Sequence, residues 1–132
     1  MELHLKDLRL KTGVIQTPMA ACTDLAFRLI AREKGMEFAF LEMVSARALI
    51  DRRARTLEMM RTVPEDKPLG AQLVGCVAEE MGAAAAAVEE MGFDLVDLNL
   101  GCPAPKITGG GTAPAPPCCA SRRRPGRFST RW

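Results

Sequence analysis

The sequence predicts an α/β fold built on a parallel sheet. Apolar runs typical of strands cover 14–17, 38–41 and 69–74, and a fourth begins at Leu95. Segments with helical spacing separate these runs, and such alternation is typical of parallel sheets with right-handed crossovers. Polar or reactive residues follow several of the runs, where parallel folds place their sites.

The N-terminal elements follow from local patterns. Leucines alternate with polar residues over 3–10, around Lys6-Asp7, which predicts a β-hairpin. Thr23 or Asp24 can cap a helix that starts at Leu25, because their side-chain oxygens accept from free N–H groups. Leu25 and Leu29, and likewise Ala26 and Ile30, recur at i, i+4, and we expect them to share the inward face. Gly35 predicts the end of this helix.

The later elements follow in the same way. Ser45 can cap a short helix through 48–50, and a further helical segment covers about 55–61. A longer helix is expected over 78–91, with Met81, Ala85 and Val88 facing inward and Gly92 as its stop.

Composition narrows the class of protein. The chain has 132 residues and a net charge of +2, but residues 112–132 hold five arginines and no acid. The start lacks a signal peptide pattern and no long apolar run follows, so we expect a cytoplasmic protein without a membrane segment.

The chain has five cysteines, an odd number, which argues against a disulfide framework. It has no Cys-x-x-Cys pair and a single histidine, His4, which argues against a zinc site.

The fourth apolar run ends in Asn99-Leu100-Gly101-Cys102-Pro103. Glycine and proline stop a strand abruptly, so Cys102 is expected at the C-terminal mouth of the strand, with Asn99 close by. The alternative is a small buried thiol that only packs, because free cysteine is among the most buried residue types.

Three segments together resemble the tRNA-dihydrouridine synthases. The first is Pro-Met-Ala-Ala-Cys-Thr-Asp-Leu-Ala-Phe-Arg at 18–28, the second Glu-Met-Val-Ser-Ala-Arg-Ala-Leu at 42–49, and the third Asp-Leu-Asn-Leu-Gly-Cys-Pro-Ala-Pro-Lys at 97–106. The resemblance implies that residues 1–111 are the N-terminal half of an FMN-binding (β/α)8 TIM barrel. Residues 112–132 depart from the family, and their Ala/Pro/Arg/Gly/Cys bias indicates a disordered, frameshifted tail. The alternative is an arginine-rich arm that binds tRNA phosphates.

The resemblance also implies a reaction, the FMN-dependent reduction of uridine in tRNA to dihydrouridine with NADPH or NADH as the reductant. It assigns Cys102 as the proton donor, and a thiol is mostly protonated at neutral pH. Lys106 lies near enough in sequence to favour the thiolate, so a nucleophilic role stays open. It assigns Pro18, Met19, Ala20 and Gln72 to the flavin. It assigns Asn99 either to the uracil edge or to the orientation of the loop.

Weaker candidates and other functions stay open. Glu42 and Arg47 are candidates behind the site, but solvated or structural roles suit them equally well. We expect the 132-residue chain to be inactive by itself if it is a truncated enzyme. The alternatives are another FMN barrel that reduces a small molecule, of the dihydroorotate or enoate reductase type, and a fragment without function.

Overall fold

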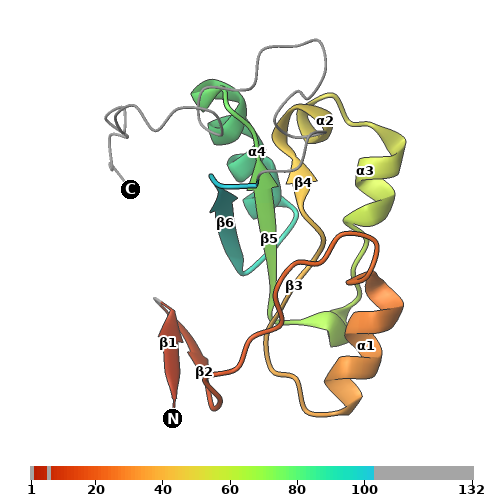
Figure 1. Cartoon of the computed structure of the whole chain (residues 1–132), viewed down its shortest axis with the longest axis vertical. Coiled ribbons are helices and arrows are strands. Elements are labelled where there is room, and N and C mark those ends of the chain that lie inside the picture. Colours follow the sequence, from red (N-terminus) through yellow and green to blue (C-terminus); the bar gives the residue numbers. More distant parts are fainter. Residues whose placement is uncertain (1, 6, 103–132) are drawn as a thin grey trace. The chain divides into compact units, whose positions relative to one another are not determined.

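The computed structural model describes residues 2–5 and 7–102 (Figure 1). The chain divides into two units, Met1–Asn99 and Leu100–Trp132, and of the second unit only Leu100–Cys102 are described. The first unit carries every helix and strand named below. Among the described residues, no helix is long and apolar enough to cross a membrane. The expected tail, 112–132, lies outside the described residues.

A parallel sheet organises the first unit, with β5 (Leu69–Val74) at its centre. One edge of β5 pairs with β6 (Leu95–Asn99). The other edge pairs with β3 (Ala39–Phe40) near its start and with β4 (Val44–Ser45) near its end, so β3 and β4 act as one interrupted strand. The sheet is therefore parallel, with strands in chain order, as the alternating pattern predicts.

The first expected strand, 14–17, is reduced to one parallel bridge between Gln16 and Ala39. Gln16 N–H donates to Phe38 at 3.0 Å, and Phe40 N–H donates to the Gln16 carbonyl at 3.1 Å. Pro18 has no N–H to extend this ladder, and Val14 is 74% exposed. The bridge still puts this segment beside β3, in the position expected for a first strand.

Four helices connect the strands. They are α1 (Leu25–Glu33), α2 (Ala46–Ile50), α3 (Ala54–Met59) and α4 (Ala78–Glu90). Asp24, not Thr23, caps α1 by accepting from Phe27 N–H at 2.8 Å, and Ser45 caps α2. Gly35 and Gly92 follow α1 and α4 with φ of 94° and 79°, which confirms both predicted stops.

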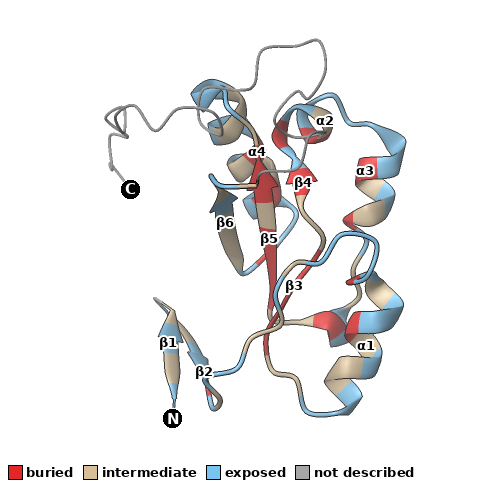
Figure 2. Cartoon of the chain, viewed as in Figure 1, coloured by how far each residue is buried: buried red, intermediate tan, exposed pale blue. Residues whose placement is uncertain are grey.

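The two faces of the sheet carry different clusters. One face packs against the helices, and its core includes Leu41, Val44, Leu69, Leu73 and Val88. Figure 2 shows buried residues in β3, β4 and β5. On α4, Val88 is buried as expected, while Met81 and Ala85 are partly buried against the same cluster.

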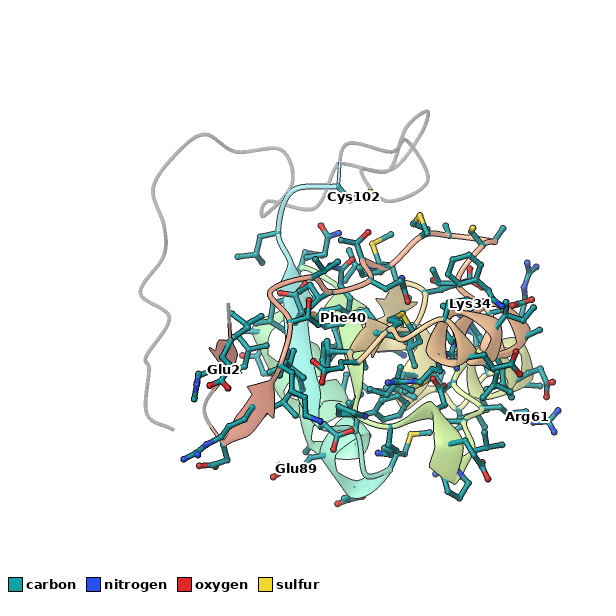
Figure 3. The ribbon with its side chains drawn as sticks, turned by 90° about the horizontal axis from the view of Figure 1, so that it is seen from below. Glu2, Lys34, Phe40, Arg61, Glu89 and Cys102 are labelled. Carbon is teal, nitrogen blue, oxygen red and sulfur yellow. The ribbon has the colours of Figure 1, made fainter. Side chains whose placement is uncertain are left out.

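The opposite face carries a smaller apolar cluster of Leu10, Phe38 and Phe40, with Leu95 beside it. The rings of Phe38 and Phe40 meet edge to face, with centroids 5.2 Å apart. Two short antiparallel strands, β1 (Leu3–Leu5) and β2 (Leu8–Leu10), supply further leucines to it. Phe40 lies inside the unit, whereas Arg61 lies at its edge (Figure 3).

The expected inward face of α1 is wrong in part. Ile30 is 60% exposed and Ala26 is exposed, while Arg28 is the buried residue of the helix. Arg28 faces inward because Asp66, in the 3₁₀ turn Pro64–Asp66, supplies a buried carboxylate partner. An arginine can occupy an inward helical position only with such a partner, which apolar periodicity does not reveal.

Candidate active site

A chain of polar side chains lies on the sheet face opposite the helices. The register pairs Gln72 with Asp97 and Val74 with Asn99. Because side chains alternate along a strand, Gln72, Asp97 and Asn99 share one face. Phe40 and Gly70 pair one row closer to the strand starts. The polar chain therefore lies between the apolar cluster and the C-terminal ends of the strands.

Gln72 is the middle member of this chain. Its Nε2 donates to Asp97 Oδ2 at 2.6 Å, and its Oε1 accepts from Asn99 Nδ2 at 3.0 Å. The same Asn99 nitrogen lies 3.3 Å from the sulfur of Met43. All three polar residues are half-buried. The structure thus brings together Gln72 and Asn99, the residues predicted to contact flavin and uracil, although their roles stay predictions.

The predicted cofactor turn, Pro18 to Ala20, is held by Thr23. The buried Thr23 hydroxyl lies 3.1 Å from both the N–H and the carbonyl of Met19, and Thr23 N–H also donates to that carbonyl. The Thr23 carbonyl in turn accepts from Arg28 Nη1 at 2.7 Å. Met19 itself is 39% exposed, so the turn is rigidly anchored yet accessible.

Glu42 also fixes this turn. Ala21 adopts the left-handed conformation, with φ of 58°, and its N–H donates to Glu42 Oε2 at 2.5 Å. A non-glycine residue in this region is strained unless its surroundings hold it there. Glu42 is therefore a support of the turn. This contact gives Glu42 a structural role, which the sequence alone did not decide.

A groove of about 460 Å³ lies beside the same turn. Its charged lining residues are Asp24, Glu42, Arg55, Glu58 and Arg61. Neither Pro18–Ala20 nor Gln72 lines it, so the groove and the predicted flavin contacts are separate features of the described residues.

Arg47 belongs to the outer surface. It pairs with Asp51 and with Glu80, both at 3.1 Å, and its side chain is 63% exposed. The hydrogen bond to Glu80, followed by that to Asp51, raises the pKa of Arg47 above its ordinary value. These partners favour the structural interpretation of Arg47.

Cys102 follows Asn99 by three residues and is half-buried, whereas Cys22 and Cys76 are exposed. Cys102 belongs to the second unit, so its proximity to Asn99 stays a prediction. Lys106 lies outside the described residues. Among residues 2–5 and 7–102, no group of three His, Cys, Asp or Glu side chains is placed to hold a metal ion.

Sequence reasoning assigned no role to Asp97. The two-residue period of a strand could have indicated Asp97, because it lies two residues before Asn99 and therefore shares the same face of the sheet. Arg28 and Asp66 were also missed. Their contact joins distant segments, and no local pattern points to it.

Comparison with known proteins gives a consistent match. Residues 15–114 match the family model described as dihydrouridine synthase. A protein of Rickettsia prowazekii named "Probable tRNA-dihydrouridine synthase" is 34% identical over 110 residues, which cover 82% of this chain and 33% of the relative. A protein of the same name from Rhodobacter capsulatus is 35% identical over 111 residues, covering 83% and 34%. One from Synechocystis named "Probable tRNA-dihydrouridine synthase 1" is 37% identical over 115 residues, covering 84% and 32%. The chain thus spans about a third of the length of these curated relatives.

Proposed function

The chain belongs to the dihydrouridine synthase family, and we propose that it contributes the N-terminal part of an enzyme that reduces uridine to dihydrouridine in tRNA. The observation that carries this proposal is the pairing of Gln72 with Asn99 on one face of the sheet. Both residues lie in the matched segment, 15–114, and both point to the face that a closed barrel would enclose. A tRNA substrate also implies that the enzyme works in the cytoplasm.

We propose that the sheet is the first half of a (β/α)8 barrel. In support, its strand positions follow chain order, run parallel, and carry the helices on one face. The other face has the mixture expected of a barrel interior: aromatic rings near the strand starts and polar side chains nearer the strand ends. Residues 1–111 are the proposed extent of this half.

The described residues fit FMN. Gln72 offers an amide, which has both donor and acceptor atoms, to the polar edge of a flavin ring. The turn Pro18 to Ala20 is anchored through Thr23, while Met19 stays accessible. When bound, FMN would supply the hydride, with NADPH or NADH as the ultimate source of electrons. No metal is needed for this chemistry.

The chain's own residues would handle the substrate and the proton. Asn99 would hydrogen-bond the uracil edge and hold the base against the sheet face. Reduction of the uracil C5=C6 bond takes one hydride and one proton, and Cys102 would donate that proton from its thiol to the second carbon. The resulting thiolate would then regain a proton from solvent.

A chimera tests the proposal. Residues 1–111 of this chain would replace the matching N-terminal third of the Rhodobacter capsulatus relative, which is assayed in parallel. We expect purified chimera with NADPH to form dihydrouridine in unmodified tRNA, detected by mass spectrometry of nucleosides. A flavin-loaded chimera that leaves tRNA unchanged, while the parent relative modifies it, would contradict the proposal. Reduction of a small enoate or of orotate instead would favour the alternative, a small-molecule FMN barrel.

A further inference from the structure

Asp97 lies beside the two predicted ligand-binding amides and has no role in the proposal so far. It is the register partner of Gln72, and its Oδ2 lies 2.6 Å from Gln72 Nε2. This distance is short for a nitrogen donor, as expected when the acceptor is a carboxylate. Asp97 is therefore the last acceptor in a series of hydrogen bonds in which Asn99 donates to Gln72 and Gln72 donates to Asp97.

The direction of the series depends on the carboxylate. An ionised carboxylate only accepts hydrogen bonds, whereas an amide donates from one side and accepts on the other. Asp97 thus requires the nitrogen of Gln72 to face it, which turns Oε1 toward Asn99. Asn99 must then direct its own nitrogen to Gln72, as observed at 3.0 Å. A flipped Gln72 would place oxygen against oxygen at Asp97 and nitrogen against nitrogen at Asn99.

We propose that Asp97 is a positioning residue that fixes the orientation of both amides. Gln72 then presents its second N–H as a donor for a ligand carbonyl. Flavin and uracil both carry ring carbonyls, and this assignment of ligands rests on the proposed function. The orientation of the amides does not rest on it.

The alternative hypothesis is that the hydrogen bond between Asp97 and Gln72 only joins β5 to β6, and this hypothesis predicts a different result. Asp97→Asn keeps the shape of the side chain and can still hydrogen-bond to Gln72. The new amide can accept from Gln72, or it can donate to a flipped Gln72. A hydrogen bond between β5 and β6 would remain with either orientation of the Gln72 amide. The orientation of the Gln72 and Asn99 amides, however, would no longer be determined.

The experiment records nitrogen–proton correlation spectra of the isotope-labelled full chain and follows the side-chain amides. In the parent, we expect one set of signals for each amide, with one Gln72 proton shifted by its bond to the carboxylate. In Asp97→Asn, we expect the Gln72 and Asn99 signals to move or to double. Asp94→Asn is the matched control, because Asp94 accepts from Leu69 N–H at 2.8 Å at the entrance to the same strand pair. That variant should leave both amides unchanged.

A double variant distinguishes an effect on the orientation of the amides from a general loss of stability of the fold. Asp97→Asn combined with Gln72→Glu moves the carboxylate to position 72, where it can accept from Asn99 and from the new amide at position 97. We expect the Asn99 signals to return toward the parent pattern. Identical Asn99 and Gln72 signals in the parent and Asp97→Asn would overturn the proposal, and so would a double variant whose Asn99 signals stay doubled.

Flavin fluorescence gives the ligand readout, measured on the chimera with the Rhodobacter capsulatus relative carrying the same substitutions, because residues 1–111 alone are not expected to hold stoichiometric FMN. We expect FMN to bind about tenfold more weakly to Asp97→Asn than to the parent, and within about twofold of the parent to Asp94→Asn. Equal affinities for the parent and Asp97→Asn would overturn the positioning role. If the parent itself shows no FMN binding, that result counts against the proposed flavin site, while the amide signals still decide the orientation.

Discussion

Arg28 and Asp66 form a buried ion pair, with Nη2 of one side chain 2.7 Å from Oδ2 of the other. Their side chains are 1% and 0% exposed. Arg32 lies 3.4 Å from the second Asp66 oxygen, and the Thr62 hydroxyl also contacts the carboxylate. Arg28 further donates to the Thr23 carbonyl, so this pair is connected to the residue that anchors the predicted cofactor turn.

Asp66→Asn should destabilise the fold strongly. It leaves the buried Arg28 without a compensating charge, and breaking such a pair typically costs about 3–5 kcal/mol. The measurement is the free energy of unfolding from urea denaturation. Glu58→Gln is the control, because it breaks the exposed pair between Arg61 and Glu58 and should cost less than about 1 kcal/mol. Similar decreases in the free energy of unfolding for the two variants would contradict a larger contribution from the buried pair.

Gly70→Ala should also be destabilising. A Cβ at Gly70 would lie 2.4 Å from Cε1 of Phe40 and 3.1 Å from Cζ of Phe38, and overpacking of this kind costs about 1–3 kcal/mol. Gly82→Ala is the matched control within α4, where a Cβ meets no atom within 4 Å. Because alanine favours helices over glycine by about 1 kcal/mol, Gly82→Ala should raise the melting temperature. Two changes of the same sign would refute the steric argument.

Ala21→Gly should stabilise the turn before α1. The left-handed conformation at Ala21 costs about 1–2 kcal/mol for a residue with a Cβ, and glycine removes this cost. The greater freedom of glycine in the unfolded chain offsets about 0.5–1 kcal/mol of the gain. Ala20→Gly has only the unfavourable effect, since Ala20 does not adopt a positive φ. Thermal unfolding compares the two variants, and a lower melting temperature for Ala21→Gly than for Ala20→Gly would contradict this account.

Cys102→Ala, placed in the chimera with the Rhodobacter capsulatus relative, should slow uridine reduction. Loss of a general acid typically lowers the rate about 10²- to 10⁴-fold. Flavin reduction by NADPH does not use this proton and should continue. The assay reduces the flavin, adds unmodified tRNA and follows flavin reoxidation in a single turnover. Unchanged reoxidation with dihydrouridine formed would rule out the acid role.

The other described cysteines provide the control for that experiment. Cys22 and Cys76 are exposed and lie outside the segment 97–106, which holds the proposed proton donor. Cys22→Ala and Cys76→Ala should therefore leave single-turnover reoxidation close to that of the unmodified chimera. If Cys102 only packs, its replacement should instead lower stability or flavin content and spare the chemical step.

The alternation of apolar runs and helical segments was enough to predict the parallel sheet. Its strand at 69–74 is observed with the same bounds, because the segment is buried on both faces and its pattern is unambiguous. The strand at 14–17 was overestimated, since its apolar residues are fewer and Pro18 ends the ladder. The faces of α1 were assigned partly wrongly, because a buried charge took the place of an apolar residue at Arg28.

Only some residues of the candidate site, and none of the contacts between them, could be predicted from the sequence. Strand ends pointed to Gln72 and Asn99, and the structure joins them by a hydrogen bond. The contact between Glu42 and Ala21 depends on a left-handed backbone at a residue that is not glycine, which no sequence rule identifies. The strand period places Asp97 on the same face as Asn99, but its pairing with Gln72 follows only from the register of β5 and β6.

The close approach of Phe40 to Gly70 limits which substitutions this sheet can accept at the two positions. The ring of Phe40 occupies the space that a side chain at position 70 would need. A residue larger than glycine at position 70 is therefore acceptable only if position 40 becomes smaller. Among variants selected for folding, the two positions should covary, and Phe40→Leu should partly rescue Gly70→Ala. Positions 40 and 70 are thus expected to change together, although 29 other residues separate them in the chain.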